Sequence, residues 1–448
     1  MMKWVRQGFL GLLLFVVGAV VVTAVLRWFA VDDAARADVA LLMTPPPAPV
    51  GDNGFAALAL AGHEVPVDQF EAVMAGEVAR FEAFERATRE ELLAMARKSP
   101  YSLADGGPSY TLLEDSGFPV REPLDYSVGC GMQADDCLAR VGEDPGAVRD
   151  LLARAGERTA LAERSLASGH LRNPYPPSLM APLPSFQLLR LPLNAAALDA
   201  VEGRVPEAMS RTCGVLANAR RHGATSTDLI PQMVMASLAN GAAGLLLDLR
   251  RAAPDVPLPA DCAPALAPVQ GEDYFVCEAI RGEFRMVSRV SHDLDASLAG
   301  KWNPRDLFLR LTAFDADTYD AWLAPRYAQT CRDDYRQAVL AGVVPPPRVE
   351  VPEMSDPTCW GAVVSCVLSN IGMADVGQYQ RRLLDNAAKL RLQLAALAVA
   401  DGRLARDAAV AEATSPGYAA TLSADGDRLQ ISLQQAGPNQ EPTFSVAL

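Results

Sequence analysis

Lysine and histidine are scarce in this chain of 448 residues, with four of each against thirty-six arginines. The formal net charge is −14, so the chain lacks the basic excess with which proteins track phosphate backbones. This balance excludes nucleic acid as an expected partner. It also argues against electrostatic docking on an anionic lipid surface.

Motifs for common chemistry are absent as well. The sequence has no Gly-x-Ser-x-Gly elbow, no Gly-x-x-x-x-Gly-Lys loop and no dinucleotide-binding fingerprint. The four histidines, His63, His170, His222 and His292, are far apart and form no His-Glu-x-x-His pair. The cysteines lack the short spacings that zinc sites use. We therefore expect no catalytic residue recognisable from a motif, no metal site and no cofactor.

A long apolar run near the N-terminus is the strongest positive signal. Residues 8–26 carry no charge, and a helix of that length spans about 28 Å, close to the roughly 30 Å core of a bilayer. Two basic residues precede the run and two aspartates follow it, which keeps residues 1–7 in the cytoplasm. The alternative, a cleaved signal peptide, has a shorter apolar region ending at a small-x-small site. The sequence therefore predicts a transmembrane anchor at 8–26.

All the cysteines follow this run. They are Cys130, Cys137, Cys213, Cys262, Cys277, Cys331, Cys359 and Cys366. Their even number favours up to four disulfides in an oxidising compartment such as a bacterial periplasm, and nearest-neighbour pairing is the first expectation. On one continuous helix Cys359 and Cys366 would lie about 10 Å apart, beyond the limit of roughly 7 Å for bridged Cα atoms. Either a turn intervenes between these two, or both pair elsewhere.

The chain after the anchor divides into three parts. Residues 27–51 read as a helical stalk followed by a stiff proline-rich spacer, because proline fixes φ and favours extended backbone. Residues 52–413 are predicted to form one helical periplasmic domain without a fixed repeat period. Its expected helical segments are 67–98, 144–169, 194–221, 225–252, 272–293, 316–341 and 374–400.

The last part, 414–448, changes its hydrophobic period from 3.6 to 2. Apolar residues alternate over 418–422 and 429–433, on either side of an Asp425-Gly426 turn, and 444–448 adds a third candidate strand. Such a sheet must bury one face, most simply against the preceding leucine-rich helix. The predicted fold class is mainly α, with an N-terminal transmembrane helix, a helix-hairpin array and a small C-terminal antiparallel sheet.

Two polar clusters are candidates for chemical sites. Ser288, Ser291, His292 and Asp293 form the most reactive-looking cluster. Neighbours on one helix do not face each other as a nucleophile and its base must, so we interpret the cluster as a solvated helix end.

Three aspartates, Asp315, Asp317 and Asp320, match part of a calcium loop, but the required glycine and distal glutamate are missing. A helix start rich in carboxylates is the preferred interpretation, because anions there complement the helix dipole. The pair Asp135 and Asp136 is interpreted in the same way.

A long irregular segment, 99–137, contains Tyr101, Tyr110, Asp125 and Tyr126 beside the Cys130 to Cys137 turn. Aromatic residues on a stapled loop can shape a ligand cleft. The alternative, packing of this loop onto the helices, is the preferred prediction.

Three segments resemble a group of uncharacterised proteobacterial proteins. The first is the proline-rich spacer running into 52–58. The other two, 201–208 and 229–234, belong to one predicted helical pair. The resemblance implies one N-terminal anchor and a largely helical exported domain, and it implies no reaction. Pro206 and Pro231 depart from it, because both lie near expected helix starts.

The function predicted from these features is a binding role. We expect an inner-membrane protein of a bacterium, crossing once, whose periplasmic domain binds another envelope protein, because helix-hairpin arrays offer extended concave surfaces. One alternative is an envelope hydrolase, which requires a deep pocket with converging carboxylates and perturbed pKa values. Another is an anchored immunity or inhibitor protein that binds an exported toxin.

Overall fold

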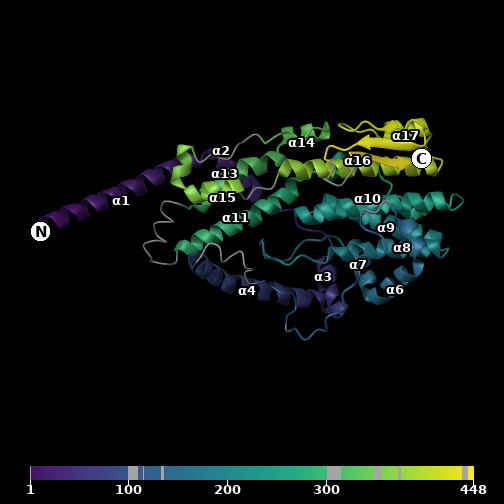
Figure 1. Ribbon diagram of the computed structural model, residues 1–448, viewed down its shortest axis with the longest axis horizontal. Helices are drawn as coiled ribbons and strands as arrows, with labels where there is room; N and C mark the ends of the chain where they lie inside the picture. Colours follow the sequence, from purple (N-terminus) through teal and green to yellow (C-terminus); the bar gives the residue numbers. More distant parts are fainter. Residues whose placement is uncertain are drawn as a thin grey trace.

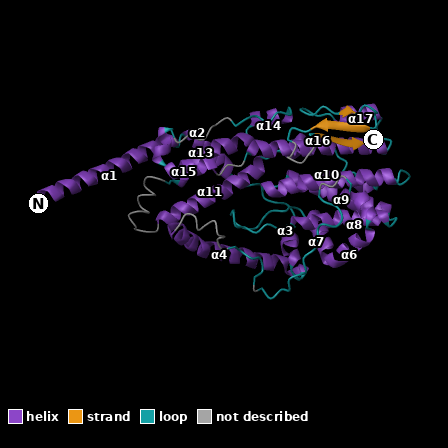
Figure 2. Ribbon diagram, viewed as in Figure 1, coloured by secondary structure: helices purple, strands orange, loops and turns teal. Residues whose placement is uncertain are grey.

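Helices make up most of the structure, a computed structural model that describes residues 2–98, 109–114, 116–132, 136–299, 314–347, 355–371, 375–435 and 442–448 (Figure 2). The helices of the first half are α1 (Met2–Ala30), α2 (Asp33–Met43), α3 (Phe55–Ala59), α4 (Phe70–Lys98), α5 (Cys137–Glu143), α6 (Pro145–Ala155), α7 (Glu157–Ala167), α8 (Leu191–Val201), α9 (Val205–Ala224) and α10 (Leu229–Ala252). Those of the second half are α11 (Cys277–Ala299), α13 (Ala316–Ala328), α14 (Asp333–Leu340), α15 (Val363–Ile371), α16 (Val376–Ala400) and α17 (Arg406–Ala413). Short 3-10 helices lie between them, among which η7 (Gln329–Cys331) and η8 (Pro357–Gly361) are used below.

Helix α1 contains the predicted anchor and projects from one end of the body, where α2, α13 and α15 lie (Figure 1). Its C-terminal end packs against η8 and α13. Arg27 fixes this junction, because its Nε donates to the carbonyl oxygen of Gly361 at 2.8 Å. A Cβ atom at Gly361 would lie 2.9 Å from the Cβ of Leu26, so glycine permits the close approach.

A second helix, α10, is apolar because it is buried in the body. Among the residues that the structure describes, α10 is the one helix long and apolar enough to cross a membrane, and 78% of its most apolar stretch is buried in the body. Helices α8, α9 and α16 pack against α10, and α8 also packs against α9. A helix that is apolar on all sides belongs in a core. The shorter apolar stretch Val17–Trp28 of α1 lies outside this core.

The stalk interpretation of 27–51 was wrong. The helix predicted within this segment is present as α2, but it packs against α11 and α13 instead of standing clear of the body. Its buried Asp38 accepts two hydrogen bonds of 2.8 Å from Arg332, and Arg281 donates to the carbonyl oxygen of Leu41. The spacer after α2 also follows the body surface, since Arg172 donates to the carbonyl oxygen of Pro47. Its partners lie about 240 to 290 positions further along the chain, so no local pattern in the sequence reveals them.

Two predicted helices are each divided by a glycine. Gly156 separates α6 from α7 with φ 53°, and Gly203 lies between α8 and α9 with φ 87°. A positive φ is easily adopted by glycine and ends a right-handed helix. The prolines that departed from the resemblance, Pro206 and Pro231, fall in the first turns of α9 and α10, where their missing N–H groups cost no intrahelical bond.

Arginine side chains tie loops to this helical core. The guanidinium of Arg221 donates to the carbonyl oxygens of Leu166, Ser168 and Gly169. Arg220 does the same for the loop carbonyls of 265, 267 and 268. A lysine ammonium lacks this planar fork of donors. The structure therefore gives many of the arginines a role that the sequence did not reveal.

The nearest-neighbour prediction for the cysteines is confirmed. The disulfides join Cys130 to Cys137, Cys213 to Cys262, Cys277 to Cys331, and Cys359 to Cys366. The last pair is closed because η8 ends before α15 begins, so a turn brings the two Cα atoms to 5.5 Å. The pair Cys277 and Cys331 joins the start of α11 to the end of the α13 region. Such bridges fit an oxidising compartment outside the cytoplasm.

The C-terminal sheet is confirmed, with strand order β1–β2–β3. Strands β1 (Thr421–Leu422), β2 (Arg428–Ser432) and β3 (Thr443–Ala447) are antiparallel, and β2 and β3 pack against α16. Gly426 takes the positive φ that the turn requires. Asp385 of α16 holds the sheet, accepting hydrogen bonds from the Tyr418 hydroxyl at 2.6 Å and from the amides of Gln434 and Gln435 at 2.8 and 2.9 Å. One buried apolar cluster includes residues from Leu42 to Val446, so the sheet shares the core of the helices.

Burial of His222 in α9 predicts an acid-sensitive fold. This side chain is 3% exposed, its Nε2 lies 2.8 Å from the carbonyl oxygen of Leu166, and burial lowers its pKa to about 4. Between pH 6.5 and 4 the unfolded chain binds a proton that the folded chain refuses. Stability is therefore lost as the pH falls through this window, by about 2 kcal/mol between pH 7.5 and 5.

Urea unfolding of the full chain in mild detergent at these two pH values measures the loss. In His222→Gln, an amide replaces the titrating ring while keeping a donor for Leu166, so the pH-dependent loss should shrink by about 2 kcal/mol. An unchanged pH dependence in this variant would show that His222 does not set it.

Candidate functional site

Helix α11 borders two neighbouring cavities. The first, called here the α1/α11 cleft, measures about 1090 Å³ and lies between α11, α13 and the adjoining parts of α1 and α2. It is lined by Val20, Ala24, Arg27, Trp28, Val31, Arg36, Val39, Met43, Pro177, Arg285, Ser288, Arg289, His292, Asp315, Asp317, Thr318, Asp320 and Ala321. The second, called the proline pocket, measures about 540 Å³ and shares Met43, Pro177 and Arg285 with the cleft.

The two polar clusters of the sequence meet in the α1/α11 cleft. Asp320 of α13 accepts hydrogen bonds from Ser288 at 2.5 Å and from Ser291 at 3.2 Å, and His292 Nε2 lies 3.0 Å from it. These three donors all come from α11, whose residues at i, i+3 and i+4 lie on one face. Interpreting the α11 group as a solvated helix end was therefore wrong for Ser288 and Ser291, because both serines are buried in this contact in the middle of α11.

The three aspartates have separate roles. Asp315 caps α13, since its Oδ1 accepts from the amide of Thr318 at 2.7 Å, which confirms the helix-start interpretation. Asp317 lies in the first turn, 82% exposed and 3.9 Å from His292. Asp320 is only 3% exposed, and burial raises the pKa of its carboxyl group while Ser288 and His292 partly offset this rise. For Asp320 the helix-start interpretation was wrong.

This cluster meets part of what a hydrolase needs. A buried carboxylate of raised pKa, a half-exposed imidazole and two hydroxyls converge in a cleft. However, within the described residues both serines donate to Asp320 or to backbone, and no serine bonds to His292. A serine nucleophile needs a base within hydrogen-bond reach. The hydrogen bonds from Ser288, Ser291 and His292 to Asp320, called here the Asp320 clamp, join α11 to α13. The imidazole of His292 lies at the edge of the cleft.

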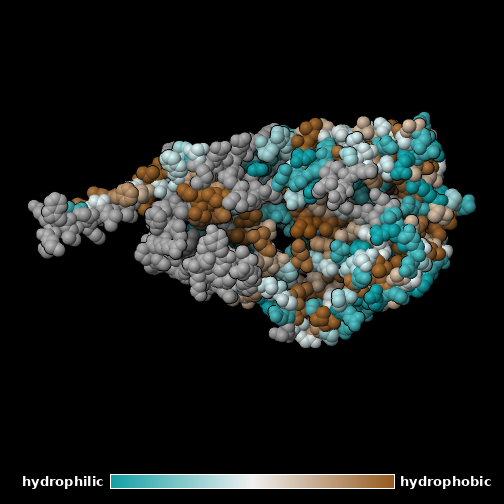
Figure 3. Space-filling view, in the orientation of Figure 1, coloured by the Kyte–Doolittle hydropathy of each residue, from teal (hydrophilic) through white to brown (hydrophobic). Residues whose placement is uncertain are grey.

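The proline pocket is lined largely by apolar side chains and prolines. Its apolar and proline residues are Met43, Pro45, Pro46, Phe55, Tyr175, Pro176, Pro177, Leu179, Ala181, Leu183, Pro184, Ile230, Pro231 and Met286. Leu179, Leu183 and Ile230 are 68%, 54% and 48% exposed. Exposed aliphatic residues grouped around one pocket are typical of binding surfaces. Figure 3 shows hydrophobic residues bordering a hollow on the face that it displays.

Two carboxyl groups, Asp228 and Glu283, lie in the proline pocket, and no motif in the sequence indicates either of them. Burial raises the pKa of Asp228, and burial together with the nearby Asp228 raises that of Glu283. Asp228 precedes α10 and Glu283 lies in α11, and Gly282 brings the two elements together, because a Cβ atom there would lie 2.0 Å from the carbonyl oxygen of Thr227. In the sequence, Asp228 looks like an ordinary helix cap and Glu283 like one charge of an amphipathic helix. No local signal pairs them.

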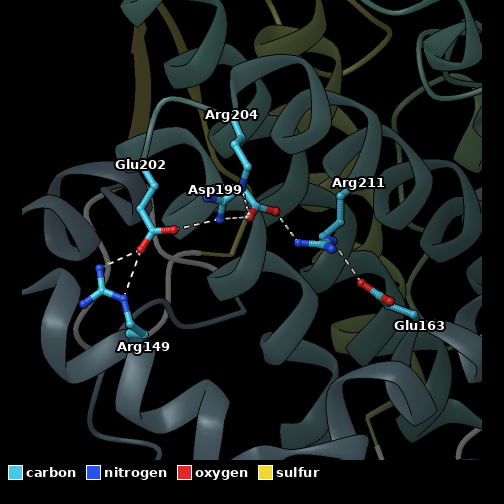
Figure 4. Close-up of polar contacts among 6 residues, drawn as sticks. All are labelled: Arg149, Glu163, Asp199, Glu202, Arg204 and Arg211. Atoms are coloured by element: carbon cyan, nitrogen blue, oxygen red, sulfur yellow. Dashed lines mark hydrogen bonds and ion pairs between the residues drawn. The ribbon is translucent and has the colours of Figure 1, made fainter.

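A chain of ion pairs connects α6, α7, α8 and α9 (Figure 4). It runs through Arg149, Glu202, Arg204, Asp199, Arg211 and Glu163. Every charge in it already has an opposite partner, and most of the arginine side chains are half exposed. Exposed pairs of this kind contribute little individually. We interpret the chain as a link between helix ends.

The described part of the irregular segment after α4, residues 109–114 and 116–132, packs onto the helices. Tyr110 contacts Phe81 with ring centroids 5.1 Å apart, and its hydroxyl donates to Glu77 at 2.9 Å. Asp125 accepts from the amide of Ser127, and Tyr126 lies beside the guanidinium of Arg190. Two residues named for this part of the chain, Tyr101 and Asp135, lie outside the described residues. Packing, rather than a cleft, accounts for the described part.

The remaining histidines are not brought together. His63 and His170 each belong to an isolated bridge, with Val120 and Asn53 respectively, and His222 is buried in α9. In the described parts of the chain, no group of three histidine, cysteine or acidic side chains is placed to hold a metal ion.

Comparison with known proteins adds no name to this site. No protein-family model matches the chain, and no curated protein or solved structure shows significant similarity to it.

Proposed function

We propose that α1 anchors the chain in the inner membrane of a bacterium and that the disulfide-bonded helical domain lies in the periplasm. One observation carries this proposal. Helix α1 projects from the body with exposed apolar side chains, among them Phe15 at 75% and Trp28 at 73% exposure (Figure 1). Such a surface is costly in water and favourable in a bilayer. The four disulfides and the basic residues before the apolar run support the outward orientation.

We further propose that the domain acts by binding another envelope protein at the proline pocket. Three exposed aliphatic residues, Leu179, Leu183 and Ile230, surround the pocket and offer an apolar centre for a partner's side chain. Arg172 and Arg285 lie in the same lining and supply a polar rim. This arrangement needs no reactive residue. It supports the binding role predicted from the sequence.

The first test concerns the membrane orientation. A reporter phosphatase that folds only in an oxidising compartment, fused after residue 448, is expected to be active, and the same reporter fused before residue 1 inactive. The chain should sediment with membranes and keep its cysteines unreactive to a thiol reagent until it is reduced. A soluble chain, or a mature N-terminus between residues 25 and 40, would contradict the anchor.

The second test concerns the binding surface. A photoreactive amino acid placed at Leu183 in the cell is expected to give one dominant protein adduct. Val120 is a matched control, because it is an equally apolar residue, 76% exposed, outside the pocket lining. Equal adducts from both positions would show non-specific contact. Mass spectrometry of the adduct also distinguishes an exported toxin, as the inhibitor alternative requires, from a resident envelope protein.

A further inference from the structure

One wall of the α1/α11 cleft is apolar and belongs to the projecting helix. Val20, Ala24 and Trp28 recur every fourth residue, so they share one face of α1. Helix α2 extends this wall with Val39 and Met43. Figure 3 also shows hydrophobic residues along the described part of α1 and in a patch on the adjoining end of the body. The cleft therefore continues the apolar surface that is proposed to lie in the membrane.

The opposite wall is polar and carries charges of both signs, because Asp315, Asp317 and Asp320 line the cleft together with the residues of α11. Arg285, Ser288, Arg289 and His292 follow the spacing i, i+3, i+4 and i+7, which places them on one face of α11. Arg289 is already paired, with Glu85 at 2.6 Å, and Arg27 is paired with Asp315 at 3.3 Å.

Two guanidinium groups that line the cleft, those of Arg36 and Arg285, have N–H groups beyond the ones used in their contacts within the described residues. The ion pair of Arg36 is with Asp33, whose side chain is 99% exposed, and its guanidinium lies 5.9 Å from the ring centre of Trp28. Arg285 donates to the carbonyl oxygen of Thr44 at 3.1 Å, and among the described residues no carboxylate lies within ion-pair distance of it. Guanidinium groups bind phosphate oxygens through several parallel hydrogen bonds.

We propose that this cleft binds one anionic phospholipid drawn laterally from the membrane, with an acyl chain along the α1 wall and its phosphate at Arg36 and Arg285. The inference rests on the proposed function, because lipid reaches the cleft only if α1 lies in the membrane. The cleft volume of about 1090 Å³ slightly exceeds the range of roughly 300 to 1,000 Å³ that is typical of small-molecule sites. Both walls therefore meet complementary parts of one amphiphile.

A transmembrane helix of a partner protein fits this cleft less well. Its apolar surface would cover the guanidinium of Arg285 and the imidazole of His292 without supplying acceptors, and burying unpaired polar groups is costly. A phospholipid supplies phosphate oxygens on that side and hydrocarbon on the other.

The test uses the full chain in nanodiscs of phosphatidylcholine containing a minor fraction of phosphatidylglycerol, with retained lipid counted by native mass spectrometry. The wild type is expected to retain one phosphatidylglycerol in preference to phosphatidylcholine. Ala24→Phe fills the apolar wall and should reduce retention at least about tenfold. Val22→Phe is its control, because Val22 is 59% exposed on the same helix and does not line the cleft.

A second pair of variants tests the head group. Removing both guanidinium groups in Arg36→Gln with Arg285→Gln should lower the preference for phosphatidylglycerol at least about fivefold while leaving acyl-chain retention. Arg86→Gln, at a 67% exposed position on α4, should change nothing. Intact disulfides and an unchanged melting temperature establish that each variant is folded.

The outcomes separate this inference from the proposed function. Protein that does not enter the discs overturns both. Protein that enters the discs but retains both lipids equally, or retains the same lipid in Ala24→Phe as in Val22→Phe, overturns the lipid site alone. Loss of retention in Ala24→Phe with loss of the anionic preference in the double arginine variant supports it.

Discussion

Replacing Cys277 and Cys331 together with alanine is expected to lower the free energy of unfolding by about 4 kcal/mol. The two residues are separated by 54 positions, and opening this long loop restores conformational freedom to the unfolded chain. The bridge also joins the start of α11 to η7 after α13, so its loss should loosen the helix pair that carries the Asp320 clamp. Urea unfolding of the oxidised full chain in mild detergent measures the change.

The short bridge between Cys130 and Cys137 provides the matched comparison. Its loop spans 7 positions, so the same double replacement should lower the free energy of unfolding by about 2 kcal/mol. Equal losses for the long and short loops would contradict the chain-entropy argument. A loss confined to the Cys277 variant, with faster hydrogen exchange in α11 and α13, would show that this bridge holds the cleft walls together.

The second large effect is expected at Asp385. Its buried carboxylate, 4% exposed, accepts one hydroxyl and two backbone amides from the segment around the C-terminal sheet. Asp385→Ala leaves these three donors without an acceptor, and we expect a loss of about 3 kcal/mol. Hydrogen exchange should rise in β2 and β3 before it rises in α9 and α10. Urea unfolding combined with exchange measurements tests both statements.

Tyr418→Phe serves as the control for Asp385. It removes only the phenolic donor, whose pKa is raised by burial and by its hydrogen bond to Asp385, and keeps the ring. The expected loss is about 1 kcal/mol. If Tyr418→Phe is as destabilising as Asp385→Ala, the two backbone hydrogen bonds do not contribute, and the sheet is held by side-chain packing on α16.

These predictions differ in how they relate to the sequence. The disulfide framework followed from the even number, order and location of the cysteines, and the pair at 359 and 366 needed only the turn that the proline at 357 and the glycine at 361 introduce. The start of α6 is of the same local kind, because Pro145 lies in its first turn and the side chain of Asp144 accepts from the amide of Ala147. Capping and turn chemistry act over a few residues, so a single sequence contains them.

The candidate site was only half visible in the sequence. Ser288, Ser291 and His292 were identified as one group and Asp320 as part of another, yet nothing local showed that α11 packs against α13 and joins them. Asp228 and Glu283 were not identified, because each has an ordinary local explanation as a helix cap or a surface charge. Convergence of this kind depends on which helix faces meet, and many faces of a helical protein are apolar enough to pair.

By itself, the sequence determined the local features: the apolar helix at the N-terminus, the approximate positions of most helical segments, the alternating strands at the C-terminus and the cysteine order. Their physical causes are spacing, capping and loop closure, which operate between near neighbours. Only the tertiary structure decided that α2 packs into the body, that arginines tie loops to helices, and that α1 and α11 together form a cleft. These features depend on contacts between residues tens to hundreds of positions apart, where burial and hydrogen bonding select one packing among many.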